Sequence, residues 1–270
     1  MLRIERAARD YLGRKLDKRV IRLIYLIWEL TTTDFRLKYS STVLGFFWSL
    51  LNPLLIFAVL YVIFSMFIRI DVPQYPLFLF LGILMWNFFM EGTLNGMSSL
   101  ANKPNLVRKV NTSKPAIVLS ACINSFMTFI LNMAVFFVFC LVLRAKIGLM
   151  SSLILVMAGI LLLIILALSL ILSAYYARYK DLKHIWAFLL NAGFWITPVV
   201  YPITLVPQKY IPLYMLNPLA RIITYSRRAV IYNSPPNPWG VFALAVFSAL
   251  LLIICFRIFR KKSPHFADYI

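Results

Sequence analysis

The sequence has few acidic residues, histidines and cysteines, and each shortage excludes a kind of function. It contains nine Asp and Glu, two His and three Cys among 270 residues. The acids do not cluster, and no Ser/His/Asp or Cys/His set occurs, which disfavours an acid–base or metal-dependent enzyme. Cys122, Cys140 and Cys255 all fall inside apolar runs, so we expect small buried side chains and no disulfide or metal site.

Glycine is also scarce, and this bears on the source of energy. The nine glycines are scattered, and none belongs to the G-x-x-x-x-G-K-S/T loop that cradles nucleotide phosphates. We therefore expect no ATP hydrolysis and no cofactor in this chain. A secondary transporter would place several carboxylates or histidines in its spans, whereas Glu91 is the only acid well inside a predicted one.

Apolar residues are abundant. They make up 62% of the chain and raise the mean hydropathy to +0.83, which excludes an ordinary soluble domain. A helix crosses a bilayer with about 20 mostly apolar residues. Six stretches meet this requirement, and they are 43–68, 77–97, 116–143, 149–176, 185–201 and 239–259. The fifth ends at Thr197 and Pro198, where we expect a break.

The sequence thus predicts an all-α membrane protein in three parts. Residues 1–42 form a cytoplasmic amphipathic interface helix and the lead-in to the first span, 43–259 the six-helix transmembrane domain, and 260–270 a cytoplasmic tail. Residues 13–30 mix basic and apolar side chains, as in a helix that lies in the head-group layer. No signal-peptide cleavage site is evident.

The basic residues predict the orientation. The formal net charge is +19, yet the Lys and Arg lie between and around the apolar runs, which favours the positive-inside rule over nucleic-acid binding. With an even number of spans, 21 of the 28 basic residues share the side of the termini. Both termini and the loop 100–115 are therefore predicted to be cytoplasmic, in a multi-pass protein of the cell inner membrane.

The outer connection 202–238 holds seven of the fourteen prolines. We expect short broken helices that re-enter the outer leaflet, sheltered by protein. An outer gate is predicted at Tyr201, Arg221, Arg227 and Arg228. For the three arginines two interpretations stand: they bind outer-leaflet phosphates or snorkel, or they take part in gating or substrate contact.

The first span carries an aromatic stripe. At about 100° per residue, one roughly 60° sector holds Tyr39, Phe46, Phe57, Tyr61 and Phe64. Such a face lets sugars slide past, or it packs against neighbouring helices or lipid. In the second span Gly92 and Gly96 form a GxxxG pair, whose default role is packing within the subunit.

Five segments carry a family resemblance, in order along the chain. They are DFRLKYSSTVLGFFWSLLNPLL (34–55), LVRKV (106–110), YKDLKHIW (179–186), FWITPVVYPITLVP (194–207) and LNPLARIITYSRRAVIY (216–232). They resemble the signature segments of ABC-2 type polysaccharide-export permeases, most of all the O-antigen permeases. Two departures stand out: Thr112 and Ser113 replace a common Phe-Pro, and Tyr179 and Lys180 precede Asp181 where Arg-Asp is usual.

The resemblance implies a homodimer that docks two ATPase subunits, which bind ATP and Mg, and moves a lipid-linked polysaccharide between its halves. It implies a coupling helix at Asn105, Leu106, Val107, Arg108 and Lys109. Leu106 and Val107 would be apolar anchors and the two cations charge partners. Alternatively, the loop only fixes topology and binds anionic lipid, at about 1 kcal/mol per basic residue.

Charge alone suggests that the lipid pyrophosphate is loaded at Arg36 and Lys38. Rival functions stay open at this point. One is an ABC-2 permease for another amphiphile, such as teichoic acid, capsule, a drug or a lipid. Another is a membrane glycosyl- or acyltransferase, in which Glu91, Asp181 or His184 would be essential. A third is a secondary transporter.

Overall fold

The chain folds into a bundle of long helices, with no strand among the residues that the structure describes. The computed structural model describes residues 18–40, 45–69, 71–108, 113–145, 148–263 and 266, with the backbone alone for 18, 19, 39, 40 and 46. In chain order the helices are α2 (Lys18–Ser40), α3 (Phe46–Tyr61) with its π-helical end η1 (Val62–Phe67), α4 (Tyr75–Ser98), α5 (Pro104–Val107), α6 (Lys114–Val142), η2 (Leu149–Ser152), α7 (Leu153–Tyr176), α8 (Leu182–Ile196), η3 (Ile203–Leu205), η4 (Gln208–Tyr210), α9 (Ile211–Tyr214), α10 (Pro218–Val230) and α11 (Pro238–Lys262). The predicted all-α class is confirmed.

Five helical segments of the described chain are long and apolar enough to cross a membrane. They are Phe47–Phe67, Tyr75–Ser98, Lys114–Val142, Leu149–Tyr176 and Pro238–Lys262. Each coincides with a predicted span. The remaining predicted span, 185–201, contains α8, whose 15 residues extend for about 22 Å, less than the ~30 Å hydrocarbon layer. The count of six spans therefore stays a prediction.

Helix α8 ends where the sequence predicts a break. Its last residue is Ile196, and Thr197 is extended, with φ −80° and ψ 141°. The cause is Pro198, whose ring disfavours helical backbone at the residue before it. The chain then runs through η3, η4 and α9 to α10. These short helices match the predicted broken helices, and their re-entry into a leaflet stays a prediction.

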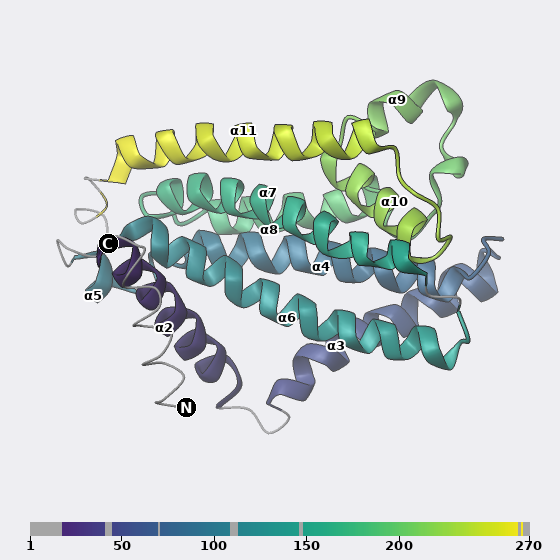
Figure 1. The fold of residues 1–270 in the computed structure, drawn as a ribbon, viewed down its shortest axis with the longest axis horizontal. Coiled ribbons are helices and arrows are strands. Elements are labelled where there is room, and N and C mark those ends of the chain that lie inside the picture. The colour runs from purple at the N-terminus through teal and green to yellow at the C-terminus, as the bar shows by residue number, and fades with distance from the viewer. Residues whose placement is uncertain are drawn as a thin grey trace.

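Helix α4 lies at the centre of the bundle, against α6 and α7 (Figure 1). Of its apolar window 78% is buried, against 17% for the windows of α3 and α11. A Cβ added at Gly92 would lie 2.7 Å from Ile165, and one at Gly96 would lie 2.2 Å from Ser169. The GxxxG pair thus permits the close approach of α4 to α7, which is the packing within the subunit that the sequence favoured.

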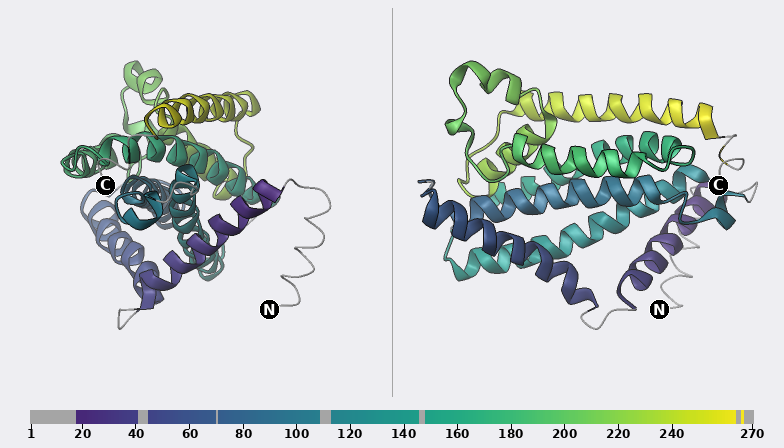
Figure 2. Two further views of the ribbon diagram at one scale, coloured as in Figure 1. Left: turned by 90° about the vertical axis from the view of Figure 1, so that its left-hand side faces the viewer. Right: turned by 180° about the vertical axis from the view of Figure 1, so that it is seen from behind.

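Helix α2 departs from the common axis and crosses one end of the bundle obliquely (Figure 2). It is joined to α6 at the buried Thr31, whose Oγ1 donates to the Ser120 carbonyl at 3.4 Å and whose carbonyl accepts from Asn124 Nδ2 at 3.4 Å. Ile24 and Trp28 are exposed. This arrangement suits a helix that lies in the head-group layer with an apolar face toward the lipid.

Helices α2 and α5 and the last turn of α11 lie at the same end of the bundle (Figure 1). That turn carries three basic residues, of which Lys262 places Nζ 3.6 Å from the ring centroid of Tyr175. At the start of α6, Lys114 Nζ donates to the Ser263 carbonyl at 2.6 Å. Helices α9 and α10 lie at the opposite end. The end of the bundle with these basic residues is the one for which the count of Lys and Arg predicts the cytoplasmic side.

Candidate functional site

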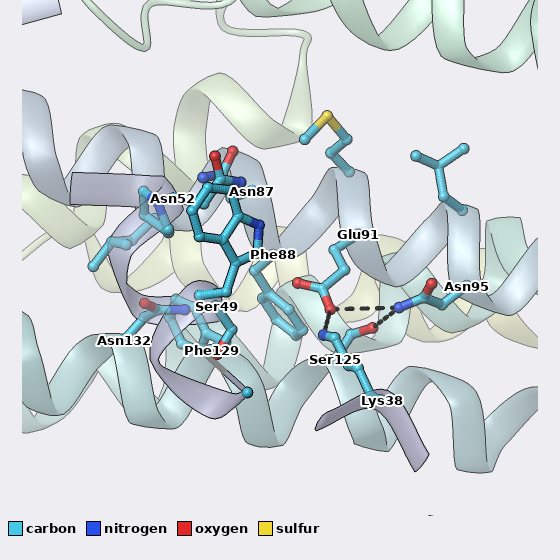
Figure 3. Close-up of a pocket in the computed structure, with 16 residues that line it drawn as sticks. Lys38, Ser49, Asn52, Asn87, Phe88, Glu91, Asn95, Ser125, Phe129 and Asn132 are labelled. Carbon is cyan, nitrogen blue, oxygen red and sulfur yellow. Dashed lines mark hydrogen bonds and ion pairs between the residues drawn. The ribbon is translucent and has the colours of Figure 1, made fainter. Parts of the chain in front are cut away.

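A cavity of about 480 Å³ opens between α3, α4 and α6, beside the end of α2. We call it the polar cavity. Its size is typical of small-molecule sites. The polar side chains that line it, shown in Figure 3, are Lys38, Ser49, Asn52, Asn87, Glu91, Asn95, Ser125 and Asn132. Polar groups within apolar spans are costly in lipid and usually mark function, so this cavity is the candidate site.

One end of the polar cavity is charged. Lys38 Nζ donates to Glu91 Oε1 in an ion pair that joins α2 to the C-terminal half of α4. Asn95 Nδ2 lies 3.5 Å from the same carboxylate oxygen and 3.0 Å from Ser125 Oγ on α6. The side chains of Lys38 and Glu91 are 34% and 30% exposed. A ligand in the cavity can therefore reach both charges, and solvent weakens their attraction.

The other end of the polar cavity is neutral. Asn52 of α3 and Asn87 of α4 point into it (Figure 3). Neither side chain forms a hydrogen bond with another residue of the described chain. Trp48, Phe88 and Phe129 complete the wall. This end thus combines unused amide donors and acceptors with aromatic surface.

A second cavity of about 530 Å³ continues from the polar cavity toward α5, and Lys38 and Asn95 line both. Here Lys103 Nζ donates to Asp34 Oδ2 at 2.5 Å, an ion pair that joins α2 to the residue before α5. Asp34 and Lys38 are one helical turn apart, so the same face of α2 contacts both cavities. The loop before α6 and the polar cavity are therefore linked through α2.

The predicted coupling residues do not all face outward. Asn105 and Arg108 are exposed. Leu106 is half-buried and lines the second cavity, and Val107 is only 2% exposed. Val107 thus packs against its own chain and does not present the apolar anchor that was expected of it, because α5 turns this side chain into the core. Lys109 lies outside the described residues.

The two cations predicted to load the lipid pyrophosphate are not brought together. Lys38 lines both cavities, whereas Arg36 is exposed and lines neither. Residues two apart on a helix point about 200° apart. Only Lys38 belongs to the candidate site.

Three side chains of the predicted aromatic stripe are described, Phe57, Tyr61 and Phe64, while those of Tyr39 and Phe46 lie outside the described residues. Phe57 is buried, and its ring centroid lies 5.2 Å from that of Phe80 in α4 and 5.5 Å from that of Phe139 in α6. Tyr61 and Phe64 pack against the same core. These three face neighbouring helices of their own chain, which is the packing alternative.

Arg227 differs from the other residues predicted at the outer gate. It is only 3% exposed, and its guanidinium donates to three carbonyls, those of Phe78 at 3.1 Å, Pro198 at 2.7 Å and Val199 at 2.5 Å. Burial lowers the pKa of Arg227 to about 9, so the group keeps its charge at neutral pH. Arg227 therefore joins α10 to α4 and to the segment after α8, and its charge is turned away from lipid phosphates.

The remaining outer residues are more accessible. Arg221 is half-buried and Arg228 is exposed. The Tyr201 hydroxyl donates to the carbonyls of Trp195 at 3.1 Å and Ile196 at 2.9 Å. Tyr201 thus closes the C-terminal end of α8, where backbone acceptors lack partners within the helix.

Glu91 and Lys38 were singled out from the sequence, whereas the amides around them were not. A signal was present: Asn87, Glu91 and Asn95 follow one another at intervals of four, which places them on one face of α4. Asn52 and Asn132 lie within other predicted spans. Polar residues that interrupt an apolar run are therefore the signal in the sequence that marks this site.

The described residues contain no group of three or more His, Cys, Asp or Glu that could hold a metal ion. Cys122, Cys140 and Cys255 are free, and the predicted burial of the three side chains is confirmed. The chemistry on offer in the polar cavity is therefore that of one ammonium, one carboxylate, amides and hydroxyls. Groups of these kinds can form hydrogen bonds and ion pairs with a polar ligand.

The apolar helices, the oblique α2 and the polar cavity together define a multi-pass membrane protein with a small-molecule-sized cavity between its helices. The chain belongs to the ABC-2 type transporter family, whose model matches residues 25–231. The resemblance that the five sequence segments showed is thereby confirmed. Members of this family are transport subunits.

Named relatives match almost the whole chain. This chain is 30% identical over 263 residues to the O-antigen export system permease protein RfbA of Myxococcus xanthus, and the alignment covers 93% of this chain and 99% of that protein. Two O-antigen export system permease proteins RfbA of Klebsiella pneumoniae are 27% and 28% identical over 248 and 252 residues. Each alignment covers 91% of this chain and 95% of the relative.

Proposed function

We propose that this chain is the transmembrane subunit of an ABC exporter that moves a lipid-linked polysaccharide of the O-antigen kind from the cytoplasm across the inner membrane. The similarity to three O-antigen export permeases over at least 91% of the chain carries the proposal. Since the sequence has no nucleotide-phosphate loop, a separate ATPase subunit with ATP and Mg supplies the energy. Two copies of this chain form the translocating unit.

The basic end of the bundle faces the cytoplasm in this proposal. Lys and Arg are retained on the cytoplasmic side of membrane proteins, and three of them end α11. Residues 1–42 then lie at the cytoplasmic interface and 202–238 form the outer region. Tyr201, Arg221 and Arg228 remain candidates for the outer gate. Arg227 instead holds α10 against α4 and the segment after α8.

The ATPase docks at α5 and the residue after it. Asn105 and Arg108 are exposed there, and they offer an amide and a cation to an acidic cleft of the partner. Leu106 and Val107 instead join this segment to the body of the subunit. A movement of the ATPase at α5 is therefore passed on to the helices against which Leu106 and Val107 pack.

Two ion pairs connect the docking segment to the polar cavity. Lys103 and Asp34 connect the start of α5 to α2, and one turn further along α2 Lys38 reaches Glu91 in the polar cavity. Closure of the ATPase subunits thereby moves α2 and changes the charged end of the cavity. This is the coupling that a transporter with a separate motor requires.

A deletion and complementation experiment tests the function. In the source organism, loss of the gene should remove the long surface polysaccharide and leave lipid-linked glycan in the inner leaflet, and the intact gene should restore export. The purified complex should contain two copies of this chain and two ATPase subunits. Unchanged surface polysaccharide in the deletion strain would exclude the proposed function.

A further inference from the structure

The polar cavity has two chemically distinct ends, and one kind of ligand matches both. We infer that it binds the glycosyl phosphate head of a lipid-linked glycan: a phosphate takes the place of Glu91 at Lys38, and the first sugar lies against Asn52 and Asn87. The inference rests on the proposed function and specifies its substrate site. It concerns one subunit and assigns Glu91 a role in controlling loading.

The charged end suits a phosphate. Glu91 pairs with Lys38, and this pairing offsets the cost of an ammonium among spans. A phosphate offers the ammonium more acceptor oxygens than a carboxylate does, and partial exposure of Lys38 leaves it reachable. Glu91 then loses its cation, but Asn95 Nδ2, 3.5 Å from Oε1, can donate to it. Glu91 is thus an internal competitor of the anionic ligand.

The neutral end suits a sugar. An Asn amide both donates and accepts, which matches a ring of hydroxyls, and the amides of Asn52 and Asn87 are not used by other described residues. Trp48 lines the same wall and is 52% exposed. Its ring offers an apolar face to the CH groups of a sugar.

The dimensions select the head of the substrate. A volume of about 480 Å³ is that of a small-molecule site, so only a short part of a long glycan fits inside it. Glu91 lies seven residues from the end of α4 at Ser98, about 10 Å along the helix axis. The charged end is therefore the one nearer the basic end of the bundle, where a cytoplasmic lipid head arrives.

The test is direct binding to the full chain in phosphatidylcholine nanodiscs, measured by calorimetry with two soluble probes. One is geranyl diphosphate, and the other is geranyl diphosphate joined to N-acetylglucosamine. Glu91→Gln should bind both probes about tenfold tighter, because the competing charge is removed, and Lys38→Gln should bind both about tenfold weaker. Glu29→Gln makes the same chemical change on the exposed part of α2 and should leave both affinities unchanged.

The side-chain amides of Asn52 and Asn87 should contribute to binding of the glycosylated probe only. Asn52→Leu and Asn87→Leu should weaken the glycosylated probe to the level of the sugar-free probe and leave the latter as in the original chain. Equal or weaker binding by a folded Glu91→Gln, or equal loss of both probes in Asn87→Leu, overturns the inference. If Glu91→Gln does not fold, Asn95→Leu replaces it, with weaker binding of both probes expected and unchanged binding overturning the inference.

Two further measurements are needed. One distinguishes the head of a lipid-linked glycan from that of a phospholipid, and the other distinguishes the binding site from the proposed export function. Phosphatidylglycerol in the nanodiscs should not compete with the glycosylated probe; competition that depends on Asn52 and Asn87 would assign the cavity to a phospholipid and overturn the inference. Export in cells is scored separately. Export that needs the gene, together with unaltered binding by the cavity variants, would reject this site while leaving the proposed function standing.

Discussion

Gly82 of α4 lies directly beneath the guanidinium of Arg227 in α10. A Cβ at this position would fall 2.3 Å from Arg227 Nη2 and 2.6 Å from the Val199 carbonyl oxygen. The absence of a side chain at position 82 is thus what lets a buried cation reach three carbonyls from two segments. Central span and outer region are joined at this point.

Gly82→Ala should therefore destabilise the protein. The added methyl group forces Arg227 or the backbone at Val199 to shift, and overpacking of this kind costs about 1–3 kcal/mol. The measurement is the unfolding temperature in detergent. Gly159→Ala is the matched control, since nothing lies within 4 Å of a Cβ there, and it should leave stability the same or slightly raised. An equal response of the two variants would contradict the close packing of Gly82 against Arg227.

Removal of the charge of the Arg227 side chain should destabilise the protein more than Gly82→Ala does. Arg227→Gln leaves buried carbonyls without their donors, at about 1–3 kcal/mol for each acceptor left unsatisfied. Thermal unfolding and proteolysis of 197–237 would report the loss. The neighbouring exposed residue provides a comparison: Arg228→Gln should shift the unfolding temperature little. Similar loss in both variants would mean that the carbonyl contacts do not stabilise the outer region.

Charge reversal at the proposed docking segment should weaken binding of the ATPase subunit and reduce export. In Arg108→Glu a like charge meets the acidic cleft of the ATPase, and such juxtaposition costs several kcal/mol, hence at least about tenfold in complex formation. Co-purification with the ATPase and export in cells are the readouts. Lys261→Glu makes the same charge change at the same end of the bundle, on an exposed residue of α11. Unchanged co-purification and unchanged export in Arg108→Glu would refute docking at this position.

The Asp34–Lys103 pair offers a swap test of the route from α5 to α2. Each reversal alone, Asp34→Lys or Lys103→Asp, should reduce export because like charges then repel where the structure has a 2.5 Å contact. The double variant restores opposite charges and should recover most of the export. Equal impairment of the single and double variants would show that the residues act separately.

Much of this fold follows from hydropathy. Apolar run length locates the five long spans, and Pro198 locates the end of α8, because lipid and the proline ring both act on local sequence. Run length alone overestimates α8, because the helix stops after 15 residues at the proline although the apolar run continues to residue 201.

The site is less readable from sequence. Helical periodicity predicted the sector that holds Phe57, but periodicity does not say whether a face meets lipid, ligand or another helix, and here it meets α4 and α6. Charge drew attention to Arg36 and Lys38 as neighbours, while the helix directs them apart. The pairing of Lys38 with Glu91, 53 positions away, needs the tertiary fold.

All three native thiols are enclosed by the protein, those of Cys122, Cys140 and Cys255. Membrane-impermeant maleimides thus meet no reactive background on the natural chain. A single cysteine introduced at Asn105 or Arg228, both exposed, can then be labelled selectively in sealed vesicles. The sidedness of each end of the bundle becomes measurable without first rebuilding its interior.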